Sequence, residues 1–170
     1  MFEKVLNLCQ RLRVYLLKKR RHLSFTFVTQ GDGGVCISGN GKISIDSTSQ
    51  LKSNTYLECS GGISIGRYFH CGRSLTIFSS NHSYDAGDFI PYSNTDVVLR
   101  PVVIEDFVWM GANVTICPGA HIGEGAIIGA GAVVVGDLES FGIYAGNPAV
   151  KIGQRDIVKF KDCKKRGLFF

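Results

Sequence analysis

Residues 104–139 can be written as six rows of six residues: IEDFVW, MGANVT, ICPGAH, IGEGAI, IGAGAV and VVGDLE. The first column is apolar throughout: Ile104, Met110, Ile116, Ile122, Ile128 and Val134. The fifth column is apolar and mostly small: Val108, Val114, Ala120, Ala126, Ala132 and Leu138. In a chain that is 45% hydrophobic, agreement at all of these positions would arise by chance about once in ten thousand windows. The stretch is therefore a six-residue repeat.

A six-residue period matches neither the 3.6-residue turn of a helix nor the two-residue alternation of a strand. It is typical of a coil whose flat sides are short strands ending at corners, so that equivalent side chains stack along one axis. Upstream, residues 41–60 and 61–80 both begin with G-x-I-S-I, which gives a looser repeat of 20 residues. We interpret this as three hexapeptides plus two residues inserted at a corner. The sequence predicts an all-β solenoid of triangular coils, with residues 28–40 as a frayed first coil.

The charge divides the 170-residue chain into three parts. Residues 1–25 carry seven Lys/Arg and one Glu, and residues 151–170 carry seven Lys/Arg and two Asp. Residues 26–150 have five basic and eleven acidic residues. A mildly acidic body with two basic ends excludes a uniformly basic nucleic-acid binder. We expect a basic N-terminal helix over 1–25, one solenoid domain over 26–150 with a projecting loop at about 80–100, and a basic C-terminal helix over 151–170.

The N-terminal segment reads as an amphipathic helix with an apolar stripe: Phe2, Val5, Leu6, Cys9, Leu12 and Leu16. This stripe favours packing on the body or on a neighbouring subunit; adsorption to an anionic membrane surface and RNA binding are the alternatives. No apolar run is long enough to span a membrane or to form a signal peptide. The six cysteines are scattered without a C-x-x-C pair, and we expect buried free thiols in a reducing cytosol, with a zinc site or a disulfide frame as the alternatives.

Several motifs occur in a fixed order along the chain: Ile65-Gly66, the loop Asn81-His82-Ser83-Tyr84-Asp85, V-W-M-G-A-N at 108–113 and A-G-N-P-A at 145–149. In this order they resemble the hexapeptide-repeat O-acetyltransferases, among them the maltose and galactoside, xenobiotic, and capsule or O-antigen acetyltransferases. The resemblance covers about residues 28–153. It implies a left-handed parallel β-helix, a homotrimer, and acetyl-CoA bound in the cleft between subunits, with no metal.

The resemblance also implies roles for individual residues. The loop histidine, His82, is the general base that takes the proton from an acceptor hydroxyl, since histidine titrates near neutral pH. Asn81, Tyr84 and Asp85 are candidates to orient His82 or the acceptor, and Trp109 is a candidate wall beside the thioester.

Small side chains are expected to let coenzyme A approach the coil, and cations to bind its phosphates. The candidate residues for coenzyme A are Gly111, Ala112, Gly129, Ala130, Lys151 and Arg155. The family's usual Thr-Lys is replaced here by Val135-Gly136, and its basic residue after A-G-N-P-A by Val150. Lys151 and Arg155 are therefore expected to take the place of the family's usual basic residues.

The sugar contacts of the maltose enzymes do not carry over, because Lys52 and Ser60 stand at the positions of their Asn and Asp. We expect a different hydroxyl acceptor, such as a surface-polysaccharide precursor, and a cytoplasmic enzyme with peripheral contact at the inner face of the membrane. A non-catalytic scaffold and a zinc enzyme of the gamma carbonic anhydrase type, using His70, His82 and His121, are the alternatives.

Overall fold

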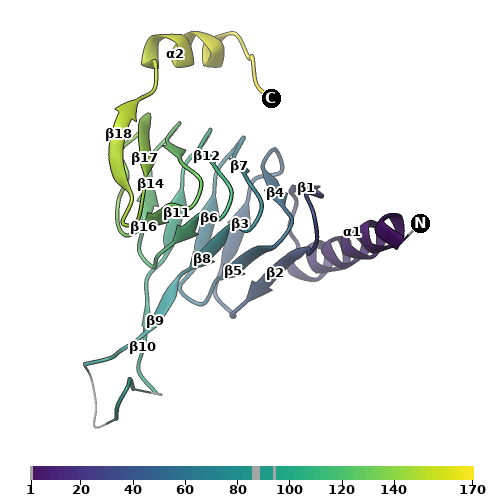
Figure 1. Ribbon diagram of the computed structural model, residues 1–170, viewed down its shortest axis with the longest axis vertical. Helices are drawn as coiled ribbons and strands as arrows, with labels where there is room; N and C mark the ends of the chain where they lie inside the picture. The colour runs from purple at the N-terminus through teal and green to yellow at the C-terminus, as the bar shows by residue number, and fades with distance from the viewer. Residues whose placement is uncertain (1, 86–88, 94) are drawn as a thin grey trace.

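The computed structural model describes residues 2–85, 89–93 and 95–170, and the side chains of its first helix from Val5 onward. Met1 and residues 86–88 and 94, which belong to the expected N-terminal helix and projecting loop, lie outside the described residues. The chain forms a β-solenoid of about six turns with a helix at each end (Figure 1), which confirms the predicted fold.

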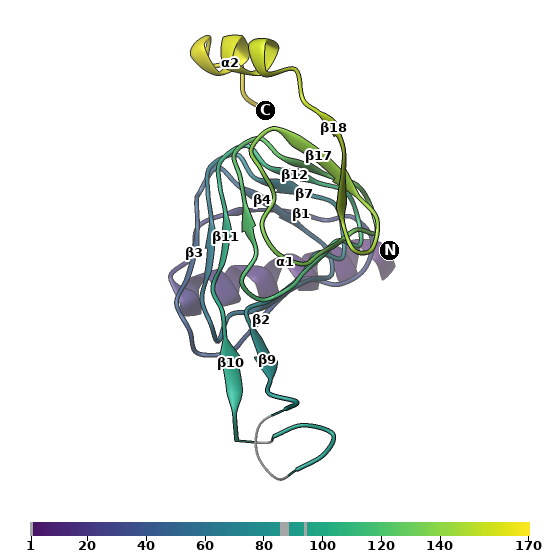
Figure 2. The same cartoon turned by 90° about the vertical axis from the view of Figure 1, so that its left-hand side faces the viewer.

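Three parallel sheets make the flat faces of the solenoid, and Figure 2 shows their triangular outline along the stack of coils. Face A contains β1 (Thr26–Val28), β4 (Gln50–Lys52), β7 (His70–Cys71), β12 (Trp109–Met110), β15 (Ile127–Ile128), β17 (Gly142–Ala145) and the antiparallel β18 (Val150–Gln154). Face B contains β2 (Val35–Ser38), β5 (Thr55–Glu58), β8 (Thr76–Phe78), β13 (Thr115–Ile116) and β16 (Val133–Val134). Face C contains β3 (Ile43–Ile45), β6 (Ile63–Ile65), β11 (Val102–Ile104) and β14 (His121–Ile122).

The strand register matches the two repeat lengths in the sequence. Ile43 pairs with Ile63 across one coil of 20 residues, and Trp109 pairs with Ile127 across one coil of 18. The first coil begins with β1 and β2, which pair with β4 and β5. The predicted coil length and the first coil near residues 28–40 are thus confirmed.

The two apolar columns of the repeat form the core of the solenoid. Every first-column residue from Ile104 to Val134 is at most 1% exposed, and the fifth-column residues are buried as well. Each step of six residues moves to the next face, and 18 residues return to the same face, so equivalent side chains stack as ladders that exclude water.

The cysteines follow this core only in part. All six are free thiols, but only Cys59 and Cys71 are buried. Cys9 and Cys36 are exposed, so the expectation of burial is wrong for these two. Cys36 alternates with the buried Ile37 on its strand and so faces outward, and Cys9 lies on an exposed part of the N-terminal helix, while Cys117 and Cys163 are half-buried.

Helix α1 (Phe2–Arg21) covers the N-terminal end of the solenoid (Figures 1 and 2). It packs on the body through Gln10 and Val14, which are 6% and 2% exposed. The Gln10 carboxamide faces the backbone of Gly33, with its nitrogen 3.0 Å from the carbonyl oxygen and its oxygen 2.9 Å from the amide nitrogen. The apolar stripe expected to make this contact points elsewhere, since Leu12 and Leu16 are more than half exposed. The helix packs on the body as expected, but through its other side.

Helix α2 (Ile157–Lys165) stands over face A at the other end of the chain (Figure 1). Asp156 caps its N-terminus by accepting a hydrogen bond from Lys159 N at 2.9 Å. Phe160 makes edge contacts with Phe107 and Phe141, with centroids 5.7 and 5.0 Å apart, and these aromatic contacts fix the helix above the face. In the described residues no helix is both long and apolar enough to cross a bilayer.

Candidate active site

A hairpin projects from the solenoid between faces B and C. Strands β9 (Ser80–His82) and β10 (Val97–Leu99) pair antiparallel, with His82 opposite Val97 and Ser80 opposite Leu99. Figures 1 and 2 show the hairpin leaving one corner of the triangular cross-section, far from α2. The predicted projecting loop is therefore a structured arm at its base.

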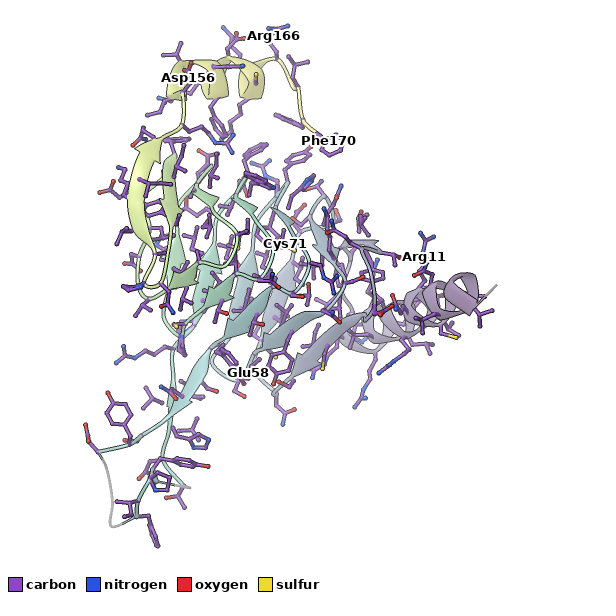
Figure 3. The ribbon with its side chains drawn as sticks, in the orientation of Figure 1. Arg11, Glu58, Cys71, Asp156, Arg166 and Phe170 are labelled. Carbon is purple, nitrogen blue, oxygen red and sulfur yellow. The ribbon has the colours of Figure 1, made fainter. Side chains whose placement is uncertain are left out.

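A carboxylate from the coil below holds the base of the hairpin. Glu58 accepts hydrogen bonds from Ser60 N at 2.8 Å, Ser80 Oγ at 2.8 Å and Ser79 N at 3.1 Å. Figure 3 shows Glu58 where the hairpin leaves the coil. Partial burial would raise the pKa of Glu58, but the hydrogen bonds from Ser60, Ser80 and Ser79 outweigh it and hold the pKa below its usual value. The ionised form is thus the one that fastens the hairpin.

Farther out, a second network closes the arm. Ser93 is 1% exposed; its amide donates to Ser83 O at 2.8 Å and its hydroxyl donates to Asp96 Oδ2 at 2.9 Å. Asp96 N donates back to Ser93 Oγ at 3.1 Å. These bonds tie the returning chain to the residue next to His82.

His82 is exposed and lies against one aromatic ring. Its imidazole and the Tyr92 ring have centroids 4.2 Å apart at 32°, and Asn81 Oδ1 accepts a hydrogen bond from His82 N at 2.9 Å. Among the described residues no side chain hydrogen-bonds the His82 ring, so its ring nitrogens are available to a substrate.

The candidates around His82 share one cavity of about 530 Å³. It is lined by the residues Asn81, His82, Ser83, Tyr84, Asp85, Val98, Arg100, Cys117, Pro118 and Val135. The structure therefore brings the three expected orienting residues to the same cavity as His82. Asp85 and Tyr84 remain exposed and hold no hydrogen bond to the imidazole within the described residues.

Trp109 lies in another part of the molecule. It is on face A, where it pairs with His70 and Ile127, and it is 51% exposed. It lines a separate cavity of about 500 Å³ between face A and α2, together with Phe160 and Phe170. Figure 3 shows Phe170 folding back from α2 toward the sheet. Within one chain, Trp109 and His82 therefore do not face a common cavity.

The four small residues expected to admit coenzyme A form one column. Each pair follows a face A strand, Gly111-Ala112 after β12 and Gly129-Ala130 after β15. A Cβ at Gly111 would lie 2.5 Å from the backbone nitrogen of Ala130, so only glycine fits there. Ala112 O accepts a hydrogen bond from Gly131 N at 2.8 Å. In these two coils the corner between faces A and B is thus narrow and carries small side chains at these positions, while Arg73 stands at the equivalent position of the coil before.

The two candidate phosphate ligands are already engaged with protein groups. Lys151 Nζ lies 2.6 Å from Glu139 Oε2, and this hydrogen bond raises the pKa of Lys151. Arg155 lies in the cavity under α2, 5.5 Å from the centre of the Phe160 ring. Burial lowers the pKa of Arg155, and its Nε is buried without a hydrogen-bond partner among the described residues.

The other coil histidines lie on two different faces. His121 on face C is exposed and its Nε2 is 2.8 Å from Glu105 Oε1. His70 on face A lies 5.6 Å from the Phe170 ring, and burial and nearby Lys52 lower its pKa. In the part of the chain that the structure describes, no three His, Cys, Asp or Glu side chains cluster as metal ligands.

Three further residues at the hairpin and its cavity are not among the candidates from the sequence: Tyr92, Arg100 and Glu58. Tyr92 and Arg100 lie in the stretch where the six-residue register is lost, so no period could place them. Glu58 stands one coil before the hairpin. The 20-residue spacing, which pairs Glu58 with Phe78 just before the hairpin, is the sequence signal that could have indicated that Glu58 lies at the base of the hairpin.

Residues 101–136 match the family described as bacterial transferase hexapeptide (six repeats). A probable macrolide acetyltransferase from Lysinibacillus sphaericus is 55% identical over 53 residues, which are 31% of this chain and 29% of that protein. A 2,3,4,5-tetrahydropyridine-2,6-dicarboxylate N-acetyltransferase from Staphylococcus aureus is 46% identical over 65 residues, 38% of this chain and 26% of that protein. The matched segments thus span less than a third of these curated relatives.

The solved structures extend the likeness over most of the chain. A hexapeptide-repeat containing acetyltransferase from Vibrio cholerae, complexed with acetyl coenzyme A, has a TM-score of 0.70 and is 25% identical. The match covers 85% of this chain and 77% of that one. The chain therefore matches the hexapeptide transferase family model over residues 101–136, and over most of its length it is similar in fold to a hexapeptide-repeat acetyltransferase.

Proposed function

We propose that this protein is an acyltransferase that moves acetyl from acetyl-CoA to a hydroxyl group of a sugar, with His82 as general base. The observation that carries the proposal is the exposed imidazole of His82, held on an anchored hairpin over a cavity of about 530 Å³ with its ring nitrogens unengaged among the described residues. A general base has to be both fixed and accessible, and this hairpin provides both.

His82 carries the proton through the reaction. Acetyl-CoA supplies an acyl group already activated as a thioester. As the acceptor oxygen forms its bond to the acyl carbon, one ring nitrogen of His82 removes the hydroxyl proton. When the carbon–sulfur bond breaks, the imidazolium returns this proton to the departing thiolate, so His82 ends as it began. Such catalysis typically contributes about 10²–10⁴-fold.

The column at Gly111, Ala112, Gly129 and Ala130 supports a binding place for coenzyme A. A pantetheine chain needs close access to backbone groups, and in these two coils the corner lacks side chains that would block it. Arg155 supports binding of the phosphates, because it is a cation with an unpartnered buried donor among the described residues. Lys151 would first have to leave Glu139.

A site that used both His82 and Trp109 would need two chains, because the two residues line separate cavities. This separation supports the homotrimer that the family resemblance implies, with each site at a boundary between neighbouring subunits.

The acceptor is the least constrained part of the proposal. Lys52 and Ser60 replace the sugar-binding residues of the maltose enzymes, which favours another hydroxyl acceptor such as a surface-polysaccharide precursor. A second candidate is transfer to an amine, which the similarity to the N-acetyltransferase from Staphylococcus aureus supports. Treating the acetylated product with alkaline hydroxylamine separates the two, because an ester is cleaved and an amide survives.

The test of the base is a comparison of two histidine variants. His82→Ala should lower turnover by about 10²–10⁴-fold, with acetyl-CoA affinity measured by calorimetry nearly unchanged. His121→Ala is the matched control, since His121 contacts Glu105 on face C and lines no part of the His82 cavity. Near-normal turnover of His82→Ala, or a larger loss in the control, would show that the base is another group. A pure protein that binds no acetyl-CoA would favour the scaffold alternative.

A further inference from the structure

Helix α1 has two opposite apolar sides, and only one of them is used by the body. The inner side carries Gln10, Val14 and the half-buried Leu17. At 100° per residue, these positions cluster within one third of the helix circumference. They close the N-terminal end of the solenoid, so the fold itself makes no demand on the other side of the helix.

The outer side is an apolar stripe that water surrounds. It consists of Val5, Leu8, Leu12, Tyr15 and Leu16, which are 55%, 68%, 55%, 55% and 56% exposed. Their helical angles lie within about 100° of one another and almost opposite the inner side. A continuous stripe along most of a 20-residue helix differs from single exposed apolar residues, which need no explanation.

Cations border this outer stripe on both margins. Arg11 lies along one margin, Arg13 and Arg20 lie along the other, and Lys19 stands at its C-terminal end, all of them exposed. None of the four forms an ion pair with a carboxylate in the described part of the chain. Figure 3 shows Arg11 on α1, and its Nε donates a long hydrogen bond of 3.5 Å to Thr29 Oγ1, a neutral group. Their charge is therefore free to act on a partner.

We infer that the outer stripe of α1 is a docking surface for an anionic lipid bilayer. The partner must be apolar along a line and negatively charged on both sides of it. A bilayer meets this requirement, because a helix lying in its interface places the stripe among acyl chains and the flanking cations at the headgroups. A second copy of α1 meets only half of the requirement, since it would bring four like-charged side chains against these four.

The position of α1 makes this contact accessible. In Figure 1 the helix lies at the end of the coil stack opposite β18, and in Figure 2 it runs across that end. The hairpin with His82 leaves from a side corner of the stack. Docking through α1 therefore leaves the His82 cavity open to substrate, and the inference does not depend on the reaction proposed for that cavity.

The test is flotation of the full-length protein with two kinds of vesicle. One is phosphatidylcholine alone, and the other contains about 30% phosphatidylglycerol. We expect binding to the anionic vesicles that weakens with added salt, and far weaker binding to the neutral ones. Leu12→Ser/Leu16→Ser should weaken binding by about 100-fold, because two side chains lose their burial. Lys19→Gln/Arg20→Gln should weaken it by about tenfold or more.

Two controls distinguish the stripe from the general charge and from assembly. Lys161→Gln/Lys165→Gln removes two exposed cations from α2. This variant should change vesicle affinity by less than about twofold. Light scattering and circular dichroism follow the oligomeric state and the fold of each variant. Absence of binding to anionic vesicles overturns the inference. An equal loss of vesicle affinity in the α2 control also overturns it. A leucine variant that changes its oligomeric state while its vesicle affinity stays the same overturns it as well, because the stripe would then be a contact between copies of the chain.

Discussion

Replacing Glu58 by glutamine tests whether one carboxylate fixes the arm that carries His82. In the structure Oε1 accepts from Ser60 N, and Oε2 accepts from both Ser79 N and Ser80 Oγ. Glutamine has the same size as glutamate, but one of the two carboxylate oxygens becomes an NH₂ group. That group would face either Ser60 N or the pair Ser79 N and Ser80 Oγ, which are themselves donors. The substitution therefore removes hydrogen bonds at the base of the hairpin without creating a cavity.

The size of the effect follows from these contacts. A hydrogen bond to a charged group contributes about 1.5–3 kcal/mol in a desolvated setting. Here the value is smaller, because Glu58 is partly exposed and Ser79 N keeps the Glu58 carbonyl oxygen as a second acceptor at 3.1 Å. We expect a loss of about 1–2 kcal/mol in the free energy of unfolding, which lowers Tm by about 2–8 °C for a chain of this length.

The effect should also depend on pH, with a definite sign. The folded state lowers the pKa of Glu58 below its ordinary value of 4.5. A group of this kind contributes stability above its unfolded pKa and loses it as the pH falls through the folded pKa. The difference in Tm between wild type and Glu58→Gln should therefore be full at pH 7 and shrink below about pH 4.5.

Thermal unfolding by circular dichroism between pH 3 and 8 measures this, with turnover assayed at pH 7. Turnover should fall as well, because His82 stands two residues after Ser80. Asp162→Asn is the matched control, since it removes an exposed pair with Arg166 and should leave Tm and turnover unchanged. An unchanged Tm in Glu58→Gln, or a difference that grows toward low pH, would refute the reasoning.

Two further predictions concern thiol reactivity and subunit sharing. Burial raises the pKa of Cys71 to about 11, so at pH 7.4 a thiol reagent should modify the exposed Cys9 and Cys36 quickly and reach Cys71 only after unfolding. Peptide mapping by mass spectrometry that finds Cys71 rapidly labelled in the folded protein would contradict this. The second experiment mixes and reassembles two inactive variants, His82→Ala and Trp109→Ala. If each site takes one residue from each of two chains, the mixture should regain part of the activity. A mixture as inactive as its parents would show that no site is shared.

The repeat made the solenoid predictable, since a column that recurs every six residues can be buried only if each coil repeats. This is why Ile104 to Val134 and their small partners were identified as core from the sequence. The hairpin lacks any such period. Its contacts join residues such as Glu58 and Ser80, or Ser93 and Asp96, through side chains whose partners no spacing rule specifies.

Helix α1 shows a different limit of sequence reasoning. The rule that the more apolar side faces the core assumes that the body is the principal apolar partner. The end of a solenoid offers only a small area, and Gln10 with Val14 satisfies it, including the backbone of Gly33. The larger stripe at Leu8, Leu12 and Leu16 was then free to face outward.

The relation between Trp109 and His82 depends on geometry that neither motif contains. The loop at 81–85 with His82 and the segment at 108–113 with Trp109 occur in the expected order along the chain. The sequence alone therefore suggests that both residues belong to one site in one chain. In the triangular cross-section the hairpin leaves the corner between faces B and C, and Trp109 is on face A, which lies opposite this corner (Figure 2). Because Glu58 and the coil hold the base of the hairpin, bending of its outer part would not carry His82 around the solenoid. If both residues act on one substrate, association of chains is required for the chemistry and not only for stability.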